Sequence, residues 1–188
     1  MLIHKGTQEL RTKRLRLRKF NLSDAAFMYQ NYATDERVTK FLTWEPYQNI
    51  EDIETFLSDT INEYLFMNVY HWAIDINDEI VGSISTTAID EKNCNCEIGY
   101  CIGYDYWNKG ITSEALSAVI NFLFKEVGMH RITAKHDIDN PASGKVMQKC
   151  SMTYEGKLRE HYLRHDGTYS DSLVYGILCS EGEELTGI

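Results

Sequence analysis

The sequence is poor in proline and contains no long apolar run. Two prolines against twelve tyrosines and seven phenylalanines argue against a disordered, proline-rich chain. No apolar run approaches the roughly 20 residues that a membrane-spanning helix needs, and the start of the chain lacks the apolar segment of a secretory signal. We therefore expect a single cytoplasmic domain over residues 1–188, with its core in residues 12–179 and a frayed acidic C-terminal tail.

Cysteine is also scarce, and its five copies are scattered. An odd number of cysteines without a secretory signal argues against a disulfide framework. A zinc site needs about four ligands in closely spaced pairs, and the pair formed by Cys94 and Cys96 has no second pair to complement it. We expect structural cysteines and no bound metal.

Basic residues are outnumbered, because 19 lysines and arginines stand against 28 acidic residues, for a net charge of −9. This balance argues against a nucleic-acid partner, since phosphate neutralisation supplies most of that affinity. The one basic run, RTKRLRLRK, alternates. Leu15 and Leu17 face one side of it and three arginines face the other, which predicts a half-buried strand with a solvated face. We expect neither a nucleic-acid partner nor a membrane partner.

The spacing of apolar residues predicts an α+β fold. Asn77 and Asp78 form a two-residue turn between two of the expected strands, and Asn49 and Asn140 are expected to cap two helices. The order of elements gives a mixed, mostly antiparallel central sheet flanked by helices. The predicted helices cover 21–33, 34–42, 49–66, 112–127 and 140–149, and the predicted strands cover 14–19, 70–76, 79–89, 94–104, 130–137, 153–163 and 168–179.

The segment YWNKGITSEAL, residues 106–116, joins a predicted strand to a predicted helix and has features of an anion site. The first N–H groups of a helix lack partners within it, and the helix dipole adds about half a positive charge there. Gly110 allows close approach of an oxyanion, Lys109 adds a positive charge, and no carboxylate appears before Glu114. These features favour a phosphate pocket, although an ordinary tight turn also explains the glycine. The nucleotide-binding patterns G-x-x-x-x-G-K-[ST] and G-x-G-x-x-G are absent.

Five short motifs follow one another along the chain: Glu97 to Tyr100, Tyr106 to Ala115, Asn140 to Ser143, Glu155-Gly156 and Asp166-Gly167. Together they resemble the GNAT superfamily of N-acetyltransferases. Within it they resemble the branch of ribosomal-protein N-terminal acetyltransferases, which reads E-I-G-Y, Y-W-G-K-G-Y-A-T-E-A, N-x-x-S, an E-G pair and a D-G turn. The opening RTKRLRLRKFNLSDA is also similar, so the resemblance spans about residues 12–179.

The resemblance implies a GNAT-like acyl-CoA N-acyltransferase fold and an acetyl-CoA-dependent N-acetyltransferase. The acceptor would be a primary amine of a protein N-terminus, as in ribosomal protein acetylation, or of a small cationic molecule, and an acidic chain attracts such cations. The loop before the helix would hold the pyrophosphate, and the strand 97–103 would hold the pantetheine arm. The implied coenzyme-binding residues are Ile98, Gly99, Tyr100, Cys101, Ile102, Trp107, Asn108, Lys109, Gly110, Ile111, Thr112, Ser113, Asn140 and Ser143.

Two residues are candidates for the chemistry. Glu97, on the strand beside the expected thioester, is the candidate base through a water, and the alternative is a rim carboxylate that pairs with a cation or orients the substrate. By the resemblance, Asn140 hydrogen-bonds the pantetheine and Ser143 lies near the thioester sulfur. Ser143 is therefore the candidate acid for the leaving thiolate, the alternative being a role in capping the helix or binding the coenzyme. A strand N–H, that of Ile98 or Gly99, would meet the oxyanion.

Some residues depart from the family pattern. Asn108 stands where glycine is usual and Thr112 where glycine or alanine is usual, so we expect weaker or altered CoA binding. Met147 occupies the position of a tyrosine acid in many superfamily members, so Ser143 or a nearby tyrosine must serve. These departures leave open a non-catalytic acyl-CoA-binding module. Both a monomer and a homodimer are compatible with the sequence.

Secondary candidates lie elsewhere on the predicted strands. Simple alternation puts Glu160 and Tyr162 on one face of the strand 153–163. His136 is expected to be packed or solvated rather than catalytic. An acceptor pocket would be lined by Trp44, Tyr47 and Trp72, which alternatively pack in the core or in loops.

Overall fold

The computed structural model describes residues 1–182, so the end of the expected acidic tail, residues 183–188, lies outside the described residues. Within the described part, the chain forms two compact units. The predicted single domain stays a prediction. The N-terminal unit comprises His4–Ser85 and Tyr100–Ala115, and the C-terminal unit comprises Met1–Ile3, Thr86–Gly99 and the described residues from Leu116 onward.

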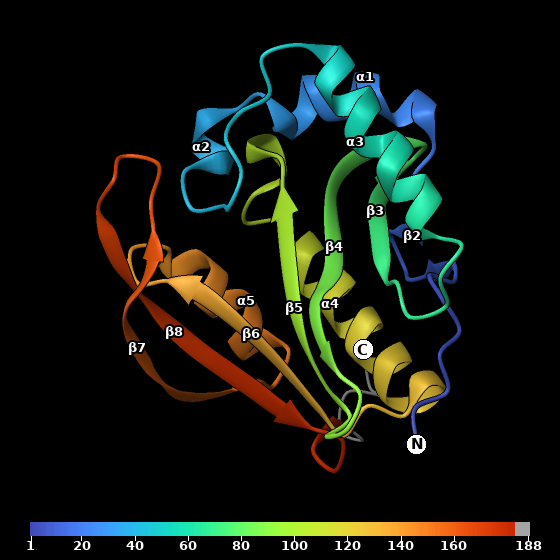
Figure 1. Ribbon diagram of the computed structural model, residues 1–188, viewed down its shortest axis with the longest axis vertical. Helices are drawn as coiled ribbons and strands as arrows, with labels where there is room; N and C mark the ends of the chain where they lie inside the picture. The colour runs from blue at the N-terminus through green and yellow to red at the C-terminus, as the bar shows by residue number, and fades with distance from the viewer. Residues whose placement is uncertain (183–188) are drawn as a thin grey trace. The chain divides into compact units, whose positions relative to one another are not determined.

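The strands are β1 (Leu10–Arg11), β2 (Arg16–Arg18), β3 (His71–Ile76), β4 (Glu79–Asp90), β5 (Asn95–Ile102), β6 (Arg131–Asp137), β7 (Thr153–Leu163) and β8 (Tyr169–Leu178). The helices are α1 (Ala25–Met28), α2 (Glu36–Thr39), α3 (Ile50–Glu63), α4 (Ile111–Phe122) and α5 (Pro141–Lys149) (Figure 1). The strands form one sheet in the order β1-β2-β3-β4-β5-β6-β8-β7. The pair β5–β6 is parallel, whereas β1–β2, β2–β3, β3–β4, β6–β8 and β7–β8 are antiparallel. The predicted fold class is confirmed.

The sheet of the N-terminal unit follows the predicted pattern closely. The hairpin between β3 and β4 turns at Asn77 and Asp78, which have φ values of 53° and 68°. Asparagine and aspartate tolerate this left-handed conformation, and it matches the twist of the flanking strands. Along β2 the leucine is buried, whereas Arg16 and Arg18 both pair with the carboxylate of Asp75 on β3, at 2.6 and 2.8 Å. The half-buried strand predicted over 14–19 therefore forms over Arg16–Arg18, where two arginines pair with a neighbouring carboxylate, and Arg14 lies in the turn before it.

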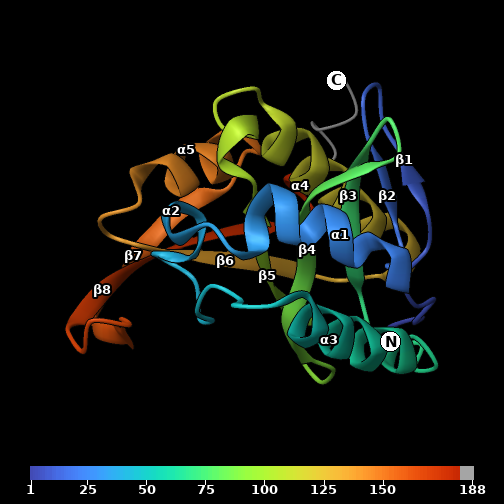
Figure 2. The same cartoon turned by 90° about the horizontal axis from the view of Figure 1, so that it is seen from above.

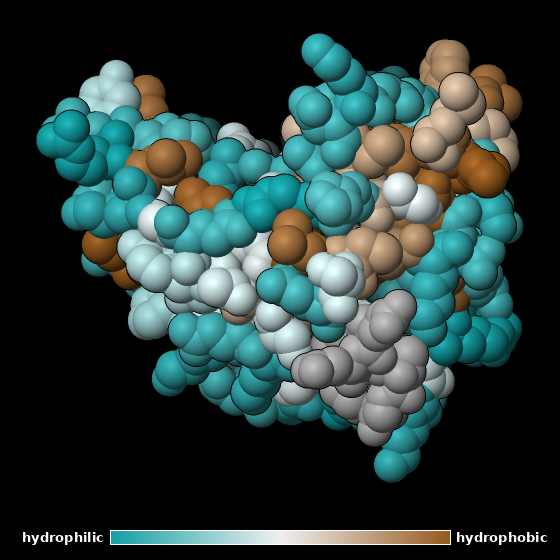
Figure 3. Space-filling model, turned by 90° about the horizontal axis from the view of Figure 1, so that it is seen from below, coloured by the Kyte–Doolittle hydropathy of each residue, from teal (hydrophilic) through white to brown (hydrophobic). Residues whose placement is uncertain are grey.

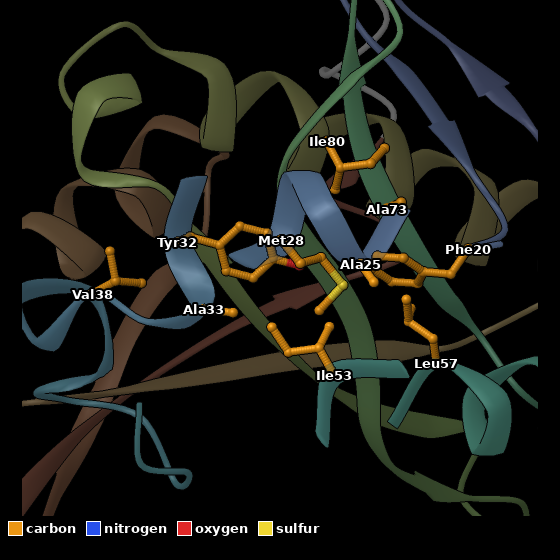
Figure 4. Packing of buried hydrophobic residues seen from close by; sticks show 10 residues of the cluster. All are labelled: Phe20, Ala25, Met28, Tyr32, Ala33, Val38, Ile53, Leu57, Ala73 and Ile80. Carbon is orange, nitrogen blue, oxygen red and sulfur yellow. The ribbon is translucent and has the colours of Figure 1, made fainter. Parts of the chain in front are cut away.

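Helices α1 and α3 of the N-terminal unit lie side by side (Figure 2). As predicted, α3 begins after Asn49, whose side chain accepts a hydrogen bond from the Asp52 N–H at 2.9 Å. The apolar faces of the helices pack into a buried cluster with residues of β3 and β4 (Figure 4). Each large aliphatic side chain buried there contributes about 1.5–3 kcal/mol. The cluster consists of Phe20, Ala25, Met28, Tyr32, Ala33, Val38, Ile53, Leu57, Ala73 and Ile80.

The predicted helix over 21–33 is not continuous. It consists of a 3₁₀ turn, the short helix α1 and a π-helical turn over Tyr29–Ala33. The side-chain amide of Asn31 in the π turn donates a hydrogen bond to the Ile80 carbonyl of β4, at 2.8 Å. The wider turn thus allows a hydrogen bond to the sheet together with burial of Tyr32. Helical periodicity in the sequence does not predict such tertiary contacts.

In the C-terminal unit, β6 pairs with β8 along its whole length, and β8 pairs with β7. Helix α5 packs against these strands (Figure 1). The β7–β8 register shifts between Leu158 and Tyr162, and Glu160 has a φ of 48°. The expectation that simple alternation puts Glu160 and Tyr162 on one face is therefore wrong, because a bulge interrupts the pleat between them.

Buried charge is rare among the described residues. The buried carboxylates are Asp24, Asp75 and Asp137, and each is paired with an arginine. The face shown in Figure 3 is mostly hydrophilic, with one larger group of hydrophobic residues at the upper right and scattered ones elsewhere. No described helix is long and apolar enough to cross a membrane. Within residues 1–182, none of the five cysteines forms a disulfide and no group of three potential metal ligands occurs.

Candidate active site

The predicted anion loop leads directly into α4, which begins at Ile111, one residue before the predicted start. Two loop residues have left-handed backbone conformations, Asn108 with a φ of 60° and Gly110 with a φ of 73°. Glycine adopts this conformation without a Cβ penalty, and asparagine is among the few other residues that tolerate it. The loop backbone therefore curls tightly before the helix starts.

The backbone donors of this loop are unpaired. Within residues 1–182, the N–H groups from Asn108 to Thr112 have no hydrogen-bond acceptor. The first bond of the helix runs from the Glu114 N–H to the Gly110 carbonyl, at 3.1 Å. A Cβ added to Gly110 would meet only the guanidinium of Arg14, at 3.6 Å. Successive unpaired N–H groups beside an open glycine form a donor set that fits a diphosphate.

Aromatic side chains hold the corner between β5 and this loop. The indole of Trp107 donates a hydrogen bond to the Ile102 carbonyl at 2.9 Å, and its ring packs 4.9 Å from that of Tyr104. The guanidinium of Arg37 on α2 lies 3.7 Å from the centre of the Tyr104 ring. Sequence reasoning placed Trp107 among the coenzyme-binding residues and missed Arg37, which no local pattern connects to the loop.

Glu114, the first carboxylate after the loop, points toward the turn between β1 and β2. Thr12 and Arg14 donate hydrogen bonds to it, and Arg14 also donates one to the Lys109 carbonyl. The ammonium group of Lys109 lies 5.3 Å from the centre of the Tyr106 ring. Sequence reasoning treated Arg14 only as part of a basic strand, because alternation predicts a face of a strand but not a contact 100 residues away.

The candidate base, Glu97, lies on β5 in the C-terminal unit. Its carboxylate pairs with Lys135 at 2.9 Å and accepts a hydrogen bond from the Thr87 hydroxyl at 3.3 Å, and its side chain is 28% exposed. The ladder between β5 and β6 runs from Asn95 to Glu97 only. The Glu97 carboxylate, at the end of this ladder, therefore has a cationic neighbour. Such a neighbour is what the alternative role, a rim carboxylate that pairs with a cation, requires.

The remaining candidates on β5 belong to different units. Ile98 and Gly99 lie in the C-terminal unit, where a Cβ on Gly99 would lie 2.9 Å from the Thr87 methyl group. The residues from Tyr100 to Ile102 lie in the N-terminal unit. Cys101 packs against the buried cluster, and burial raises the pKa of its thiol despite the hydrogen bond with Ser83. The thiol is thus held protonated and is no ready nucleophile.

Helix α5 begins as predicted, with Asn140 as its cap and Pro141 in the first turn. The Asn140 side chain accepts a hydrogen bond from the Ser143 N–H at 3.3 Å, and its amide nitrogen has no partner among the described residues. Ser143 is partly exposed. Met147, at the position where the resemblance expects a tyrosine acid, is 1% exposed and packs in the core.

The segment between β6 and α5 is fixed by Arg164. Its guanidinium donates hydrogen bonds to Asp137 at 2.6 and 2.8 Å and to Asp139 at 2.5 Å. Burial alone would raise the pKa of Asp137, but the bonds from Arg164 and from the Asp139 N–H hold it below its usual value. Burial, and then the charge of Asp137, raise the pKa of Tyr162, so that phenol stays protonated at neutral pH.

His136 and Trp72 are core residues. His136 is 7% exposed, and its Nδ1 bonds to the Asp137 carbonyl at 2.8 Å. Its Nε2 lies so near α5 that a Cβ on Gly144 would approach it to 2.6 Å. Trp72 is fully buried and donates a hydrogen bond to the Gln8 carbonyl at 2.6 Å. Both residues therefore follow the packed alternative.

Comparison with known proteins extends these observations. The family described as the acetyltransferase (GNAT) domain matches residues 14–153. The uncharacterized N-acetyltransferase p20 of Bacillus licheniformis is 32% identical over 177 residues, which cover 93% of this chain and 98% of that protein.

Two further relatives carry more specific names. The ribosomal-protein-serine acetyltransferase of Escherichia coli (strain K12) is 33% identical over 98 residues, which cover 52% of this chain and 54% of that protein. The solved structure of RimL, a ribosomal L7/L12 alpha-N-protein acetyltransferase in complex with coenzyme A, aligns with a TM-score of 0.82 and 22% identity, covering 91% of this chain and 98% of that chain. At this identity, the second likeness concerns the fold alone.

Proposed function

The chain belongs to the GNAT family of acetyltransferases, and from this premise we propose that it transfers the acetyl group of acetyl-CoA to a primary amine of a protein N-terminus or a small cationic molecule. Family membership makes it an acetyl-CoA-dependent N-acetyltransferase. The proposal concerns the residues that act and the acceptor that is used.

The observation that carries the proposal is the run of unpaired N–H groups from Asn108 to Thr112. We assign the coenzyme pyrophosphate to these groups, to Ser113 and to the positive end of α4, with Lys109 and Trp107 beside them. The side chains of Asn108, which is exposed, and of Thr112, which is buried, remove no backbone donor from the loop. All these residues lie in the N-terminal unit.

The chemistry is assigned to residues of the C-terminal unit. Acetyl-CoA supplies an activated acetyl group, and a neutral amine attacks its carbonyl carbon. Glu97, whose carboxylate pairs with Lys135 at 2.9 Å, takes the proton of the amine through a water. The N–H of Ile98 or Gly99 binds the oxyanion.

The leaving thiolate needs a proton, and two donors are available in the C-terminal unit. Ser143 stands at the start of α5, and its N–H is bonded to the cap Asn140. Tyr162 is a phenol kept protonated by burial and by the charge of Asp137. Because Met147 replaces the family tyrosine and is buried, the proton comes from Ser143 or from this tyrosine.

The acceptor is proposed from charge and from the relatives. The names of the Escherichia coli relative and of RimL give ribosomal proteins as their substrates. A net charge of −9 attracts a cationic acceptor, whether a basic protein N-terminus or a small polyamine. Free α-amines have a pKa near 8 and lysine-type amines near 10.4, so the second class depends more on a base.

The direct test supplies the purified protein with acetyl-CoA and a panel of N-terminal peptides, polyamines and aminoglycosides, and measures thiol release with a disulfide dye. We expect release that depends on the acceptor and produces acetylated amine by mass spectrometry. Tight CoA binding without release for any acceptor would replace the transferase with a non-catalytic acyl-CoA-binding module.

A second test addresses the base. We expect Glu97→Gln to lower kcat about a hundredfold for high-pKa amines and less for α-amines. Glu155→Gln is the matched control, because Glu155 is also on the sheet of the C-terminal unit, is 31% exposed and pairs with Arg131. Equal losses for both classes of amine would assign Glu97 to substrate positioning instead.

A further inference from the structure

The turn between β1 and β2 contacts the first turn of α4 through Glu114. The hydroxyl of Thr12 donates a hydrogen bond to one carboxylate oxygen at 2.5 Å, and the Arg14 N–H donates to the same oxygen at 3.0 Å. The Arg14 Nε donates to the other oxygen at 2.7 Å. The Glu114 side chain is 18% exposed and that of Arg14 is 45% exposed. Both oxygens of the carboxylate are therefore engaged by the turn.

The same guanidinium also holds the loop backbone. Arg14 Nη1 donates a hydrogen bond to the Lys109 carbonyl at 2.9 Å. In a trans peptide, the carbonyl of one residue and the N–H of the next point in opposite directions. Fixing the Lys109 carbonyl on Arg14 therefore fixes the Gly110 N–H on the opposite side of the peptide, where it is unpaired.

Arg14 also compensates charge at the helix start. Burial alone would raise the pKa of Glu114, but the hydrogen bonds from Thr12 and Arg14 lower it, so the group stays ionised at neutral pH. A bare carboxylate in the first turn would stabilise the helix dipole itself and repel a bound anion. The ion pair cancels this charge while the loop donors stay unpaired.

We propose that Arg14 is a positioning residue for the coenzyme diphosphate, because it orients the Lys109–Gly110 peptide and neutralises Glu114. This inference rests on the proposed binding of the coenzyme at the loop. Arg14 acts through the loop and through the carboxylate, and it needs no contact with the reacting atoms. Its partner Glu114 anchors the guanidinium and by itself opposes the bound anion.

The direction in which two substitutions change the affinity for CoA separates this role from a purely structural one. We expect Arg14→Met to weaken CoA binding about tenfold, because it frees the peptide and leaves Glu114 uncompensated. Glu114→Gln is expected to leave the affinity unchanged or to raise it up to about threefold, since it removes the opposing charge. The double variant should bind more tightly than Arg14→Met alone.

The experiment is calorimetric titration of CoA and of dephospho-CoA into the wild-type protein and these variants, with melting temperatures measured in parallel. Arg11→Met is the matched control, because Arg11 lies on the same hairpin and, among residues 1–182, pairs only with the exposed Glu9. In steady-state assays, Arg14→Met should raise KM for acetyl-CoA and leave kcat within about twofold. Arg14→Lys keeps the charge but cannot span both partners, so its affinity for CoA should fall between those of the wild type and of Arg14→Met. This variant replaces Arg14→Met in the test if the methionine variant does not fold.

The outcomes are distinct. Equal weakening by Arg14→Met and Glu114→Gln would overturn the inference in favour of a brace that only stabilises the fold. An Arg14→Met affinity equal to that of Arg11→Met would overturn it as well. A loss seen for CoA and not for dephospho-CoA would move Arg14 from the diphosphate to the 3′-phosphate and contradict the assignment. Wild-type protein that binds no CoA would instead contradict the proposed function itself.

Discussion

Helices α4 and α5 begin in opposite ways. At α5, Asn140 caps the helix through the Ser143 N–H, and a proline in the first turn removes a donor that would need a partner. At α4, the N–H groups from Asn108 to Thr112 have no acceptor in the described chain, and the nearest carboxylate, that of Glu114, is paired with Arg14. One start is capped by its own sequence, and the other is the proposed site of the diphosphate.

The difference has an energetic side. A side-chain cap stabilises a helix by about 1 kcal/mol, and an acidic residue in the first turn adds a few tenths more. Helix α4 forgoes the cap, and the ion pair with Arg14 cancels the charge of Glu114. In the proposed function, the uncapped donors of α4 bind the coenzyme diphosphate instead.

The largest expected effect on CoA affinity comes from adding a carboxylate to the loop before α4. We expect Gly110→Asp to weaken CoA binding about 30-fold or more, because a negative charge then lies within a few ångströms of the phosphates. Calorimetric titration measures the affinity. Among the described residues, the new Cβ meets only the Arg14 guanidinium at 3.6 Å, so packing does not oppose it.

Gly167→Asp is the matched control for this substitution. Gly167 has a φ of 80°, close to the 73° of Gly110, and a Cβ there would meet nothing within 4 Å. Both variants carry the same backbone penalty of about 1 kcal/mol. If the two variants bound CoA equally well, the diphosphate assignment would be wrong.

An intermediate effect is expected at the capped start. Aspartate caps a helix as well as asparagine does but lacks the amide donor, which has no partner in the described chain. We expect Asn140→Asp to leave the melting temperature within about 2 °C and to raise KM for acetyl-CoA about tenfold. Asn140→Ala should show the same rise in KM together with a lower melting temperature. An unchanged KM in Asn140→Asp would reduce Asn140 to a cap.

The smallest effect is expected from restoring the family glycine. Asn108 has a φ of 60°, which glycine adopts more readily and with less bulk. We expect Asn108→Gly to tighten CoA binding about threefold. Asn77→Gly, at a φ of 53° in the β3–β4 turn, is the control and should leave the affinity unchanged. Weaker binding by Asn108→Gly would mean that the Asn108 side chain itself contributes to the site.

The same two helix starts show which structural features can be predicted from the sequence. Both were predictable within one residue, since caps, glycine and proline act locally. The hairpin at Asn77 and Asp78 was predictable for the same reason. The π-helical turn near Tyr32 and the bulge in β7 were not, because each follows from contacts with distant strands.

The sequence predicted the candidate residues of the site but not the residues that pair with them. The motifs named the loop, Glu97 and Asn140, because the resemblance ties residue types to positions. The ion pair of Glu97 with Lys135 and the bonds from Arg14 connect segments far apart in the sequence. Such pairings depend on sheet register and side-chain rotamers, which the alternation of polar and apolar residues does not determine.

The most direct test of the central claim is a crystal structure of the protein with CoA bound. We predict diphosphate oxygens within about 3 Å of backbone nitrogens between Asn108 and Ser113, with the Lys109 carbonyl still bonded to Arg14. A structure in which the phosphates lie elsewhere, while these nitrogens bind water or protein atoms, would contradict the account.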